Sequence, residues 1–134
     1  MLFSYLEQLI QTQDGKILFV LTLIAIAMAI DFITGSWSAR ISKDLTPNSN
    51  KGINGILRKV ASLTLMLFFI PLSVLIPYGA GTLLLYTLYV GYLLNEILSI
   101  LENFEKMGIK TDLFESFLTV IRGKLETKED EADK

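Results

Sequence analysis

The chain has 134 residues, 51% of them hydrophobic, and a formal net charge of −2 that argues neither for nor against nucleic-acid binding. It contains no cysteine and no histidine, which excludes disulfides, thiol chemistry, imidazole general bases and the commonest zinc sites. An enzyme is therefore not expected. No catalytic residue, cofactor-binding residue or metal ligand is predicted.

Residues 1–16 form the first predicted element, a short amphipathic segment. Ser4 and Glu7 have the spacing of a capping box that would open a helix. Apolar side chains share one face of this helix, namely Leu6, Leu9 and Ile10. The helix could lie on a membrane surface or pack on a partner. The segment lacks the positive n-region of a signal peptide, so we expect it to remain in the protein.

Three long apolar blocks follow. A hydrocarbon core of about 30 Å needs about 20 helical residues, and the blocks at 17–37, 60–77 and 82–101 have about that length. Residues 17–30 are apolar on every side, whereas a helix of a soluble protein carries one apolar stripe. The sequence therefore predicts an all-α membrane protein with three transmembrane helices and short amphipathic helices at both ends.

Local features predict how these spans pack. Ala25 and Ala29 have the small-xxx-small spacing of close helix contacts. Pro71 should kink the second span, because it removes a backbone donor inside the helix. The uncharged turn from Pro77 to Gly81 should make the second and third spans an antiparallel hairpin.

The C-terminal part is predicted to form a second amphipathic helix over residues 102–125. Asp112 and Glu115 fit a capping box, and apolar residues recur after it at helical spacing. Residues 126–134 are highly charged and poor in apolar side chains, so they are predicted to be disordered.

Charge distribution predicts the orientation. The loop of residues 38–59 carries five cations against Asp44 alone: Arg40, Lys43, Lys51, Arg58 and Lys59. Short basic loops stay cytoplasmic, which places the N-terminus outside and the C-terminus in the cytoplasm. Beside two spans, these cations are better explained as a topology signal with some attraction to anionic lipid than as a nucleic-acid patch.

Charges inside the spans are candidates for function, because they are costly in a bilayer. Asp31 and Glu96 lie near the inner ends of the first and third spans, where Arg58 and Lys59 open the second. The four residues should therefore meet at similar depth as an ion-pair cluster. Such a cluster either only holds the helices together or separates when an assembly opens.

The third span also carries a polar stripe at helical spacing. Its members are Thr82, Tyr86, Tyr89, Tyr92, Glu96, Ser99 and Asn103. The stripe suits a seam between helices, where polar side chains hydrogen-bond across, or a water-lined wall of a pore. We expect the seam in a resting protomer and the wall in an assembly.

Three segments, in order, resemble the toxin-secretion/phage-lysis holins of small tailed phages of Gram-positive bacteria. Asp31 to Gly35 resembles their Asp-x-x-x-Gly signature, and Gly52, Gly55, Arg58 and Lys59 resemble their entry into the next span. The stretch containing Asn95, Glu96, Ser99, Glu102 and Asn103 resembles a third family motif. Together the matches cover about residues 17–108. After Gly108 the chain departs from the pattern.

The resemblance implies a holin that oligomerises in the cytoplasmic membrane of the bacterial host and forms lesions. These lesions release an endolysin, which would be served indirectly, without direct contact. The implied partners are other copies of the chain, the lipid bilayer and an antiholin, with no nucleic acid. An antiholin or regulatory membrane subunit is the first alternative. A small transporter using Asp31 and Glu96, and a membrane enzyme, are more remote alternatives.

Overall fold

The computed structural model describes residues 1–41 and 49–132 of the chain; Lys43 and Asp44 of the predicted basic loop lie outside them. The described residues form helices joined by short turns, with no strand among them. The elements are α1 (Leu2–Leu9), α2 (Gln13–Ile41), α3 (Ser49–Ser73), a 3-10 turn η1 (Pro77–Gly79), α4 (Ala80–Lys106) and α5 (Asp112–Ala132).

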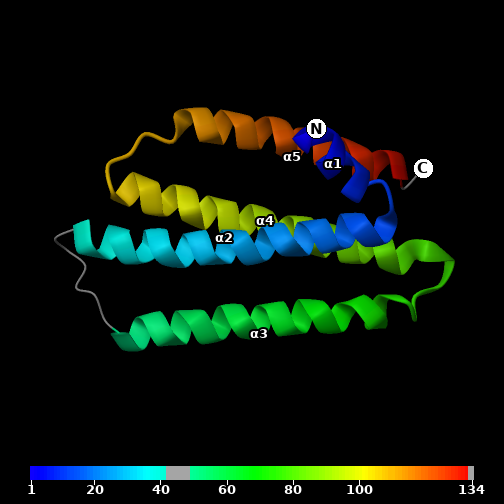
Figure 1. Ribbon diagram of the computed structural model, residues 1–134, viewed down its shortest axis with the longest axis horizontal. Helices are drawn as coiled ribbons and strands as arrows, with labels where there is room; N and C mark the ends of the chain where they lie inside the picture. The colour runs from blue at the N-terminus through cyan, green and yellow to red at the C-terminus, as the bar shows by residue number, and fades with distance from the viewer. Residues whose placement is uncertain (42–48, 133–134) are drawn as a thin grey trace.

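Three of these helices, α2, α3 and α4, are long and apolar enough to cross a membrane. The three helices lie side by side and roughly parallel to one another. Helices α2 and α4 run in the same direction, and α3, which lies between them in the sequence, runs in the opposite direction (Figure 1). The predicted fold class, three membrane helices flanked by short terminal helices, is confirmed.

The core of the bundle lies mainly between α2 and α4, which make the most extensive contacts of any pair of helices. The buried side chains of this core recur every three or four residues along α2, and α3 and α4 add to them. The connected core cluster consists of Ile17, Val20, Ile24, Met28, Met66, Leu85 and Tyr89. The stretch that looked apolar on every side thus has one face turned to protein. Its other faces remain available to lipid.

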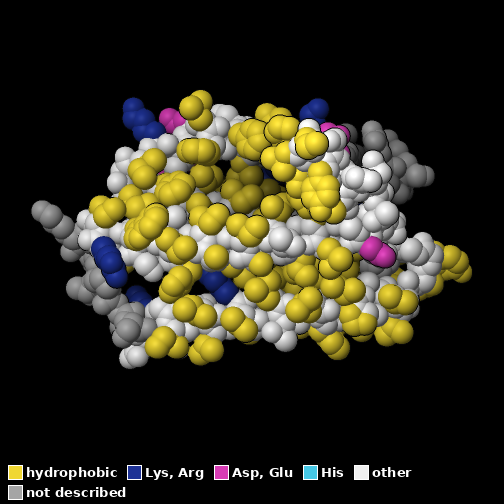
Figure 2. All heavy atoms as spheres, viewed as in Figure 1, with side chains coloured by type: hydrophobic (Ala, Val, Ile, Leu, Met, Phe, Trp, Pro, Cys, Tyr) yellow, Lys and Arg dark blue, Asp and Glu magenta, His cyan; other side chains and the backbone are white. Residues whose placement is uncertain are grey.

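Helix α3 lies at the side of this pair and is the least enclosed span. Only 6% of its most apolar 18-residue stretch is buried by protein, against 33% for α2. The face over α3 is dominated by hydrophobic side chains (Figure 2). Phe68, Leu65 and Val60 are among its exposed apolar residues. In a membrane, lipid would cover this surface, so α3 depends on few protein contacts for its position.

A compact turn joins α3 to α4. Tyr78 and Gly79 both have left-handed backbone angles, with φ of 64° and 73°. At Gly81 an added Cβ would lie 1.8 Å from the carbonyl oxygen of Ser73, so only glycine allows the two chain segments to approach so closely. Pro71 lies two residues before the end of α3, so its missing donor falls in the last turn of the helix and does not interrupt the span.

The helices extend beyond the predicted spans because apolarity marks the hydrocarbon region, whereas a helix can continue into the polar interface. The predicted first span, 17–37, lies within α2, and the third, 82–101, lies within α4. Much of the predicted loop 38–59 is helical. The second span was predicted as 60–77, but α3 begins at Ser49 and ends at Ser73.

The terminal helices also differ from the prediction in their boundaries. Helix α1 begins at Leu2 and Ser4 Oγ donates to the Met1 carbonyl at 2.9 Å, so the predicted capping box at Ser4 is wrong. The C-terminal helix begins at Asp112, not at residue 102, because α4 continues to Lys106.

Helix α5 continues through Ala132, into the segment that was expected to be disordered. That segment is rich in Glu and Lys, which are good helix formers, and contains neither glycine nor proline. Residues 133 and 134 lie outside the described part of the chain.

Candidate functional site

A single lysine joins two carboxylates from the other two spans. Lys59 Nζ of α3 lies 2.8 Å from Asp31 Oδ2 of α2 and 2.8 Å from Glu96 Oε2 of α4. The Glu96 side chain is 7% exposed, and those of Asp31 and Lys59 are 17% and 22% exposed. The pairs are thus largely shielded by the protein itself. One lysine against two carboxylates leaves this triad with an excess of negative charge.

Arg58, the fourth predicted member of the cluster, lies elsewhere. Its side chain is exposed, and neither of the salt bridges formed by the described residues includes it. Consecutive residues of a helix point about 100° apart, so only one of two adjacent cations can face the carboxylates. The structure therefore narrows the proposed cluster to Asp31, Lys59 and Glu96.

Asn103, two helical turns after Glu96 on α4, extends the triad. Its amide nitrogen donates to Asp31 Oδ1 at 2.8 Å, to the Asp31 backbone oxygen at 3.1 Å and to Thr34 Oγ1 at 3.0 Å. Thr34 in turn donates to the Ile30 carbonyl at 2.8 Å. Asp31 is thus held on both sides, by a cation from α3 and by an amide from α4.

Sequence reasoning missed the role of Thr34, which is 3% exposed. It stands three residues after Asp31, on the same side of α2, and this spacing was the available signal. Gly35 faces Asn103 at this point, and a Cβ added to Gly35 would lie 3.6 Å from the Asn103 amide nitrogen, an ordinary van der Waals contact.

A second polar tie joins α3 to α4 deeper in the bundle. Tyr89 is fully buried, and its hydroxyl donates to the backbone carbonyl of Met66 at 2.5 Å. The hydroxyl of a buried tyrosine needs such a partner, because an unpaired polar group in an apolar core is costly. The carbonyl that accepts this bond lies one residue before Leu67. The Leu67 carbonyl lacks its usual helical donor, because Pro71 has no backbone N–H.

The predicted polar stripe of α4 is buried or half-buried along its whole length in the protomer. Tyr89 and Glu96 are buried, and the other members, Thr82, Tyr86, Tyr92, Ser99 and Asn103, are half-buried. The members whose partners are described reach α2 or α3. The stripe lies at the seam of the three helices, with α3 as part of its cover.

The remaining residues of the family motifs have less to contact. Gly52 lies near the Phe32 ring, at 3.9 Å from an added Cβ, and Gly55 has nothing within 4 Å. Asn95 and Glu102 are exposed. The geometry of the protomer explains no structural role for Gly55, Asn95 or Glu102.

Comparison with known proteins decides the family. The bacteriophage holin family matches residues 8–122, which include all three spans and the triad. The chain belongs to the bacteriophage holin family. This holin-family chain is 30% identical over 112 residues to a protein of Bacillus phage phi29 named antiholin, with 84% of each chain covered. It is 31% identical over 133 residues to the antiholin of Bacillus phage B103, covering 98% of this chain and 96% of that one. No solved structure matches it.

The membership agrees with the resemblance noted from the three motifs. Three apolar helices and this family indicate a multi-pass membrane protein concerned with phage lysis. The triad of the holin-family chain is therefore a set of charges inside a membrane bundle.

Proposed function

We propose that the protein is a holin that assembles with copies of itself in the cytoplasmic membrane of the bacterial host and opens lesions through which an endolysin is released. In this proposal the N-terminus lies outside and the C-terminus in the cytoplasm, as the basic segment around α3's start favours. The proposal rests on one structural observation: α3, the least enclosed span, covers a polar face of α4.

That cover is held by few polar contacts. Lys59 binds Asp31 and Glu96, and the Met66 carbonyl binds Tyr89. Removal of α3 from this position would uncover the part of the stripe that faces α3, Tyr89 and Glu96, together with Asp31. In hydrocarbon those groups would be unsatisfied, so the arrangement is favourable only if water or another polar surface takes the place of α3. A water-filled assembly supplies that replacement.

Surfaces for assembly are available on the other side of α2. Ala25 and Ala29 are exposed in the protomer, so the small-xxx-small pair is not used within the chain. Small residues at this spacing allow the backbones of two membrane helices to approach closely. This face supports contact between copies while α3 is displaced.

The test is inducible expression in bacteria with and without a cytoplasmic endolysin, followed by optical density. A holin should cause abrupt growth arrest alone, and lysis only when the endolysin is present. Continued growth with the protein confirmed in the membrane fraction would contradict the proposal. The Lys51→Met variant serves as a control. It should behave as the wild type does, because Lys51 is exposed and takes part in neither described salt bridge.

The proposed exposure of the stripe can be measured in the same cells, because the chain has no cysteine of its own. Ser99→Cys places a thiol on the stripe with little change of volume, and Ala25→Cys places one on the outer face of α2. A membrane-permeant maleimide reacts with the thiolate form of cysteine, and the thiolate forms only where water reaches the side chain. Labelling of Ser99→Cys should rise at the moment of growth arrest, while Ala25→Cys stays unlabelled. No rise at Ser99 during lysis would mean that the stripe does not line the lesion.

An antiholin is the second candidate, because both relatives described above carry that name. An antiholin would use the same helices to bind a holin without opening the membrane. Expression alone would then leave growth unchanged, and co-expression with a lysis-competent holin would delay lysis. Copurification of the two proteins with a delay in lysis would favour this candidate over the first.

A further inference from the structure

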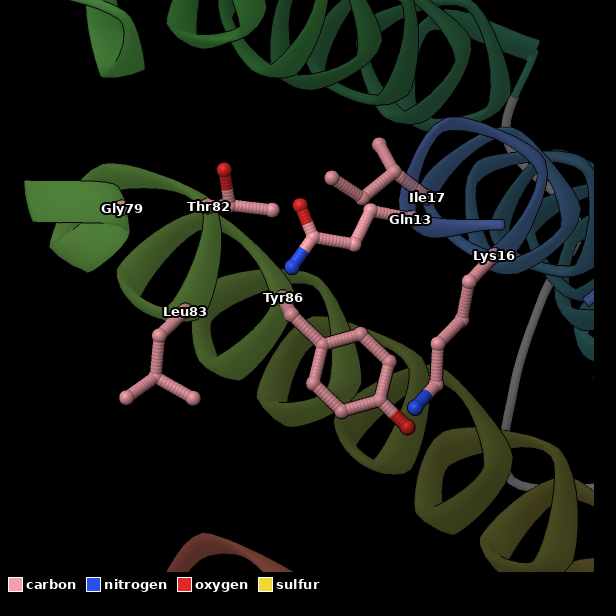
Figure 3. Close-up of a pocket in the computed structure, with 7 residues that line it drawn as sticks. All are labelled: Gln13, Lys16, Ile17, Gly79, Thr82, Leu83 and Tyr86. Atoms are coloured by element: carbon pink, nitrogen blue, oxygen red, sulfur yellow. The ribbon is translucent and has the colours of Figure 1, made fainter. Parts of the chain in front are cut away.

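A pocket lies between α2 and α4 at the end of the bundle opposite to the triad. It has a volume of about 240 Å³ and opens where both helices begin. Figure 3 shows its lining, with Gln13, Lys16 and Ile17 from α2, Gly79 from η1, and Thr82, Leu83 and Tyr86 from the start of α4. None of these residues belongs to the holin-like motifs.

Lys16 gives the pocket a positive charge, and no described side chain neutralises it by a salt bridge. Its ammonium lies 4.6 Å from the centroid of the Tyr86 ring, which holds it at the pocket by a cation–π contact. Neither salt bridge formed by the side chains of residues 1–41 and 50–124 includes Lys16. The carboxylate nearest in sequence, Asp14, is exposed and does not line the pocket. An anionic ligand would therefore complete the charge balance here.

The lining combines hydrogen-bond donors with apolar walls. Gln13 carries an amide and Thr82 a hydroxyl, and both side chains stand beside the space between the helices (Figure 3). Ile17 and Leu83 supply the apolar part. A volume of 240 Å³ is below the about 300–1,000 Å³ of pockets for drug-sized ligands, so the space suits one polar headgroup.

The depth of the pocket matches that of lipid headgroups. Lys16 directly precedes Ile17, the first residue of the apolar run, and Thr82 opens the apolar part of α4. A ligand with its polar group at Lys16 would have its apolar part alongside Ile17 and Leu83, facing the bilayer. A polar group joined to an apolar part is the structure of a phospholipid, whereas a fully water-soluble ligand would make no use of the apolar wall.

We propose that this pocket binds the phosphate diester of an anionic phospholipid. Lys16 is the ion partner of the phosphate, Gln13 and Thr82 donate hydrogen bonds to its oxygens, and the acyl chains follow the apolar wall. A headgroup without a cation, such as that of phosphatidylglycerol, fits better than phosphatidylcholine, whose choline would face Lys16. The site depends on the packing of the start of α4 against α2 and not on whether the protein opens lesions.

Titration of the detergent-solubilised full chain with phosphatidylglycerol, followed by native mass spectrometry, tests the site. We expect one tightly held lipid per chain in the wild type and in Lys16→Arg. Lys16→Gln should bind it about ten-fold more weakly, equivalent to about 1.4 kcal/mol. Lys51→Gln removes the same charge at the other end of the bundle and should bind as the wild type does. Circular dichroism of each variant checks that the helices are intact.

Two further arms identify the source of the phosphate. Phosphatidylcholine should bind more weakly than phosphatidylglycerol in the wild type. Inorganic phosphate in excess should fail to displace the lipid, because it lacks the apolar part; displacement would show a site for free phosphate and overturn the lipid assignment. Equal losses in Lys16→Gln and Lys51→Gln would show non-specific attraction to basic residues and overturn the site itself.

Discussion

Replacement of Lys59 by methionine should destabilise the bundle by about 3 kcal/mol, because it leaves two carboxylates facing each other without a cation. At 2.8 Å and an effective dielectric of about 20, each ion pair has a Coulomb attraction of about 6 kcal/mol, which desolvation of the charges largely offsets. Removal of one partner of a buried pair costs about 3–5 kcal/mol. The 22% exposure of the Lys59 side chain places the cost at the lower end of that range.

The assay is unfolding of the purified chain in mixed micelles by increasing SDS, followed by far-ultraviolet circular dichroism. Lys59→Met should unfold at a clearly lower SDS fraction than Lys51→Met, which removes an exposed lysine of the same helix. Further replacement of Asp31 by asparagine and Glu96 by glutamine should recover part of the loss, because no uncompensated charge then remains. Equal transitions for Lys59→Met and Lys51→Met would refute the triad as a stabilising contact.

Three further changes test the same structure. Glu96→Gln leaves Lys59 with one carboxylate and should shift the time of lysis at equal protein level in the membrane; unchanged timing would remove Glu96 from the opening step. Tyr89→Phe deletes a buried hydroxyl that binds an α3 carbonyl and should cost about 1 kcal/mol in the SDS titration, with no loss refuting that bond. Gly81→Ala should lower the SDS midpoint because its Cβ would collide with the Ser73 carbonyl, whereas Gly91→Ala, at a position with open space, should not; matching midpoints would contradict the close turn.

The sequence was sufficient to predict that Asp31, Lys59 and Glu96, on three different helices, meet at one level of the bundle. Apolar blocks of spanning length fix the direction of each helix, so the height of Asp31, Lys59 and Glu96 follows from counting residues. Rotation about each helix axis does not follow in the same way. This is why Arg58 was expected beside Lys59 in the cluster, although it lies about 100° further round the helix.

Contacts between residues far apart in the chain were beyond the sequence argument. Asn103 was identified as polar, but its binding to Asp31, 72 residues earlier, depends on the packing of α4 on α2. The loose position of α3 was also unpredicted, since composition alone made all three spans similar. Helix ends were displaced because the interface tolerates helical backbone beyond the apolar blocks, as at Ser49 and Lys106.

The order of α2, α3 and α4 along the chain has a consequence for biosynthesis. Asp31 and Lys59 emerge from the ribosome before Glu96, so their pair is available while the third helix does not yet exist. An unpaired aspartate or lysine costs about 2.5–3.5 kcal/mol at the centre of an inserting helix and less near its end, where Asp31 and Lys59 lie, and the early pair lowers that cost. Arrival of α4 then adds a second carboxylate to a pair that was neutral. The nascent chain therefore inserts in a charge-balanced form, and the surplus negative charge arises only when the last helix is in place.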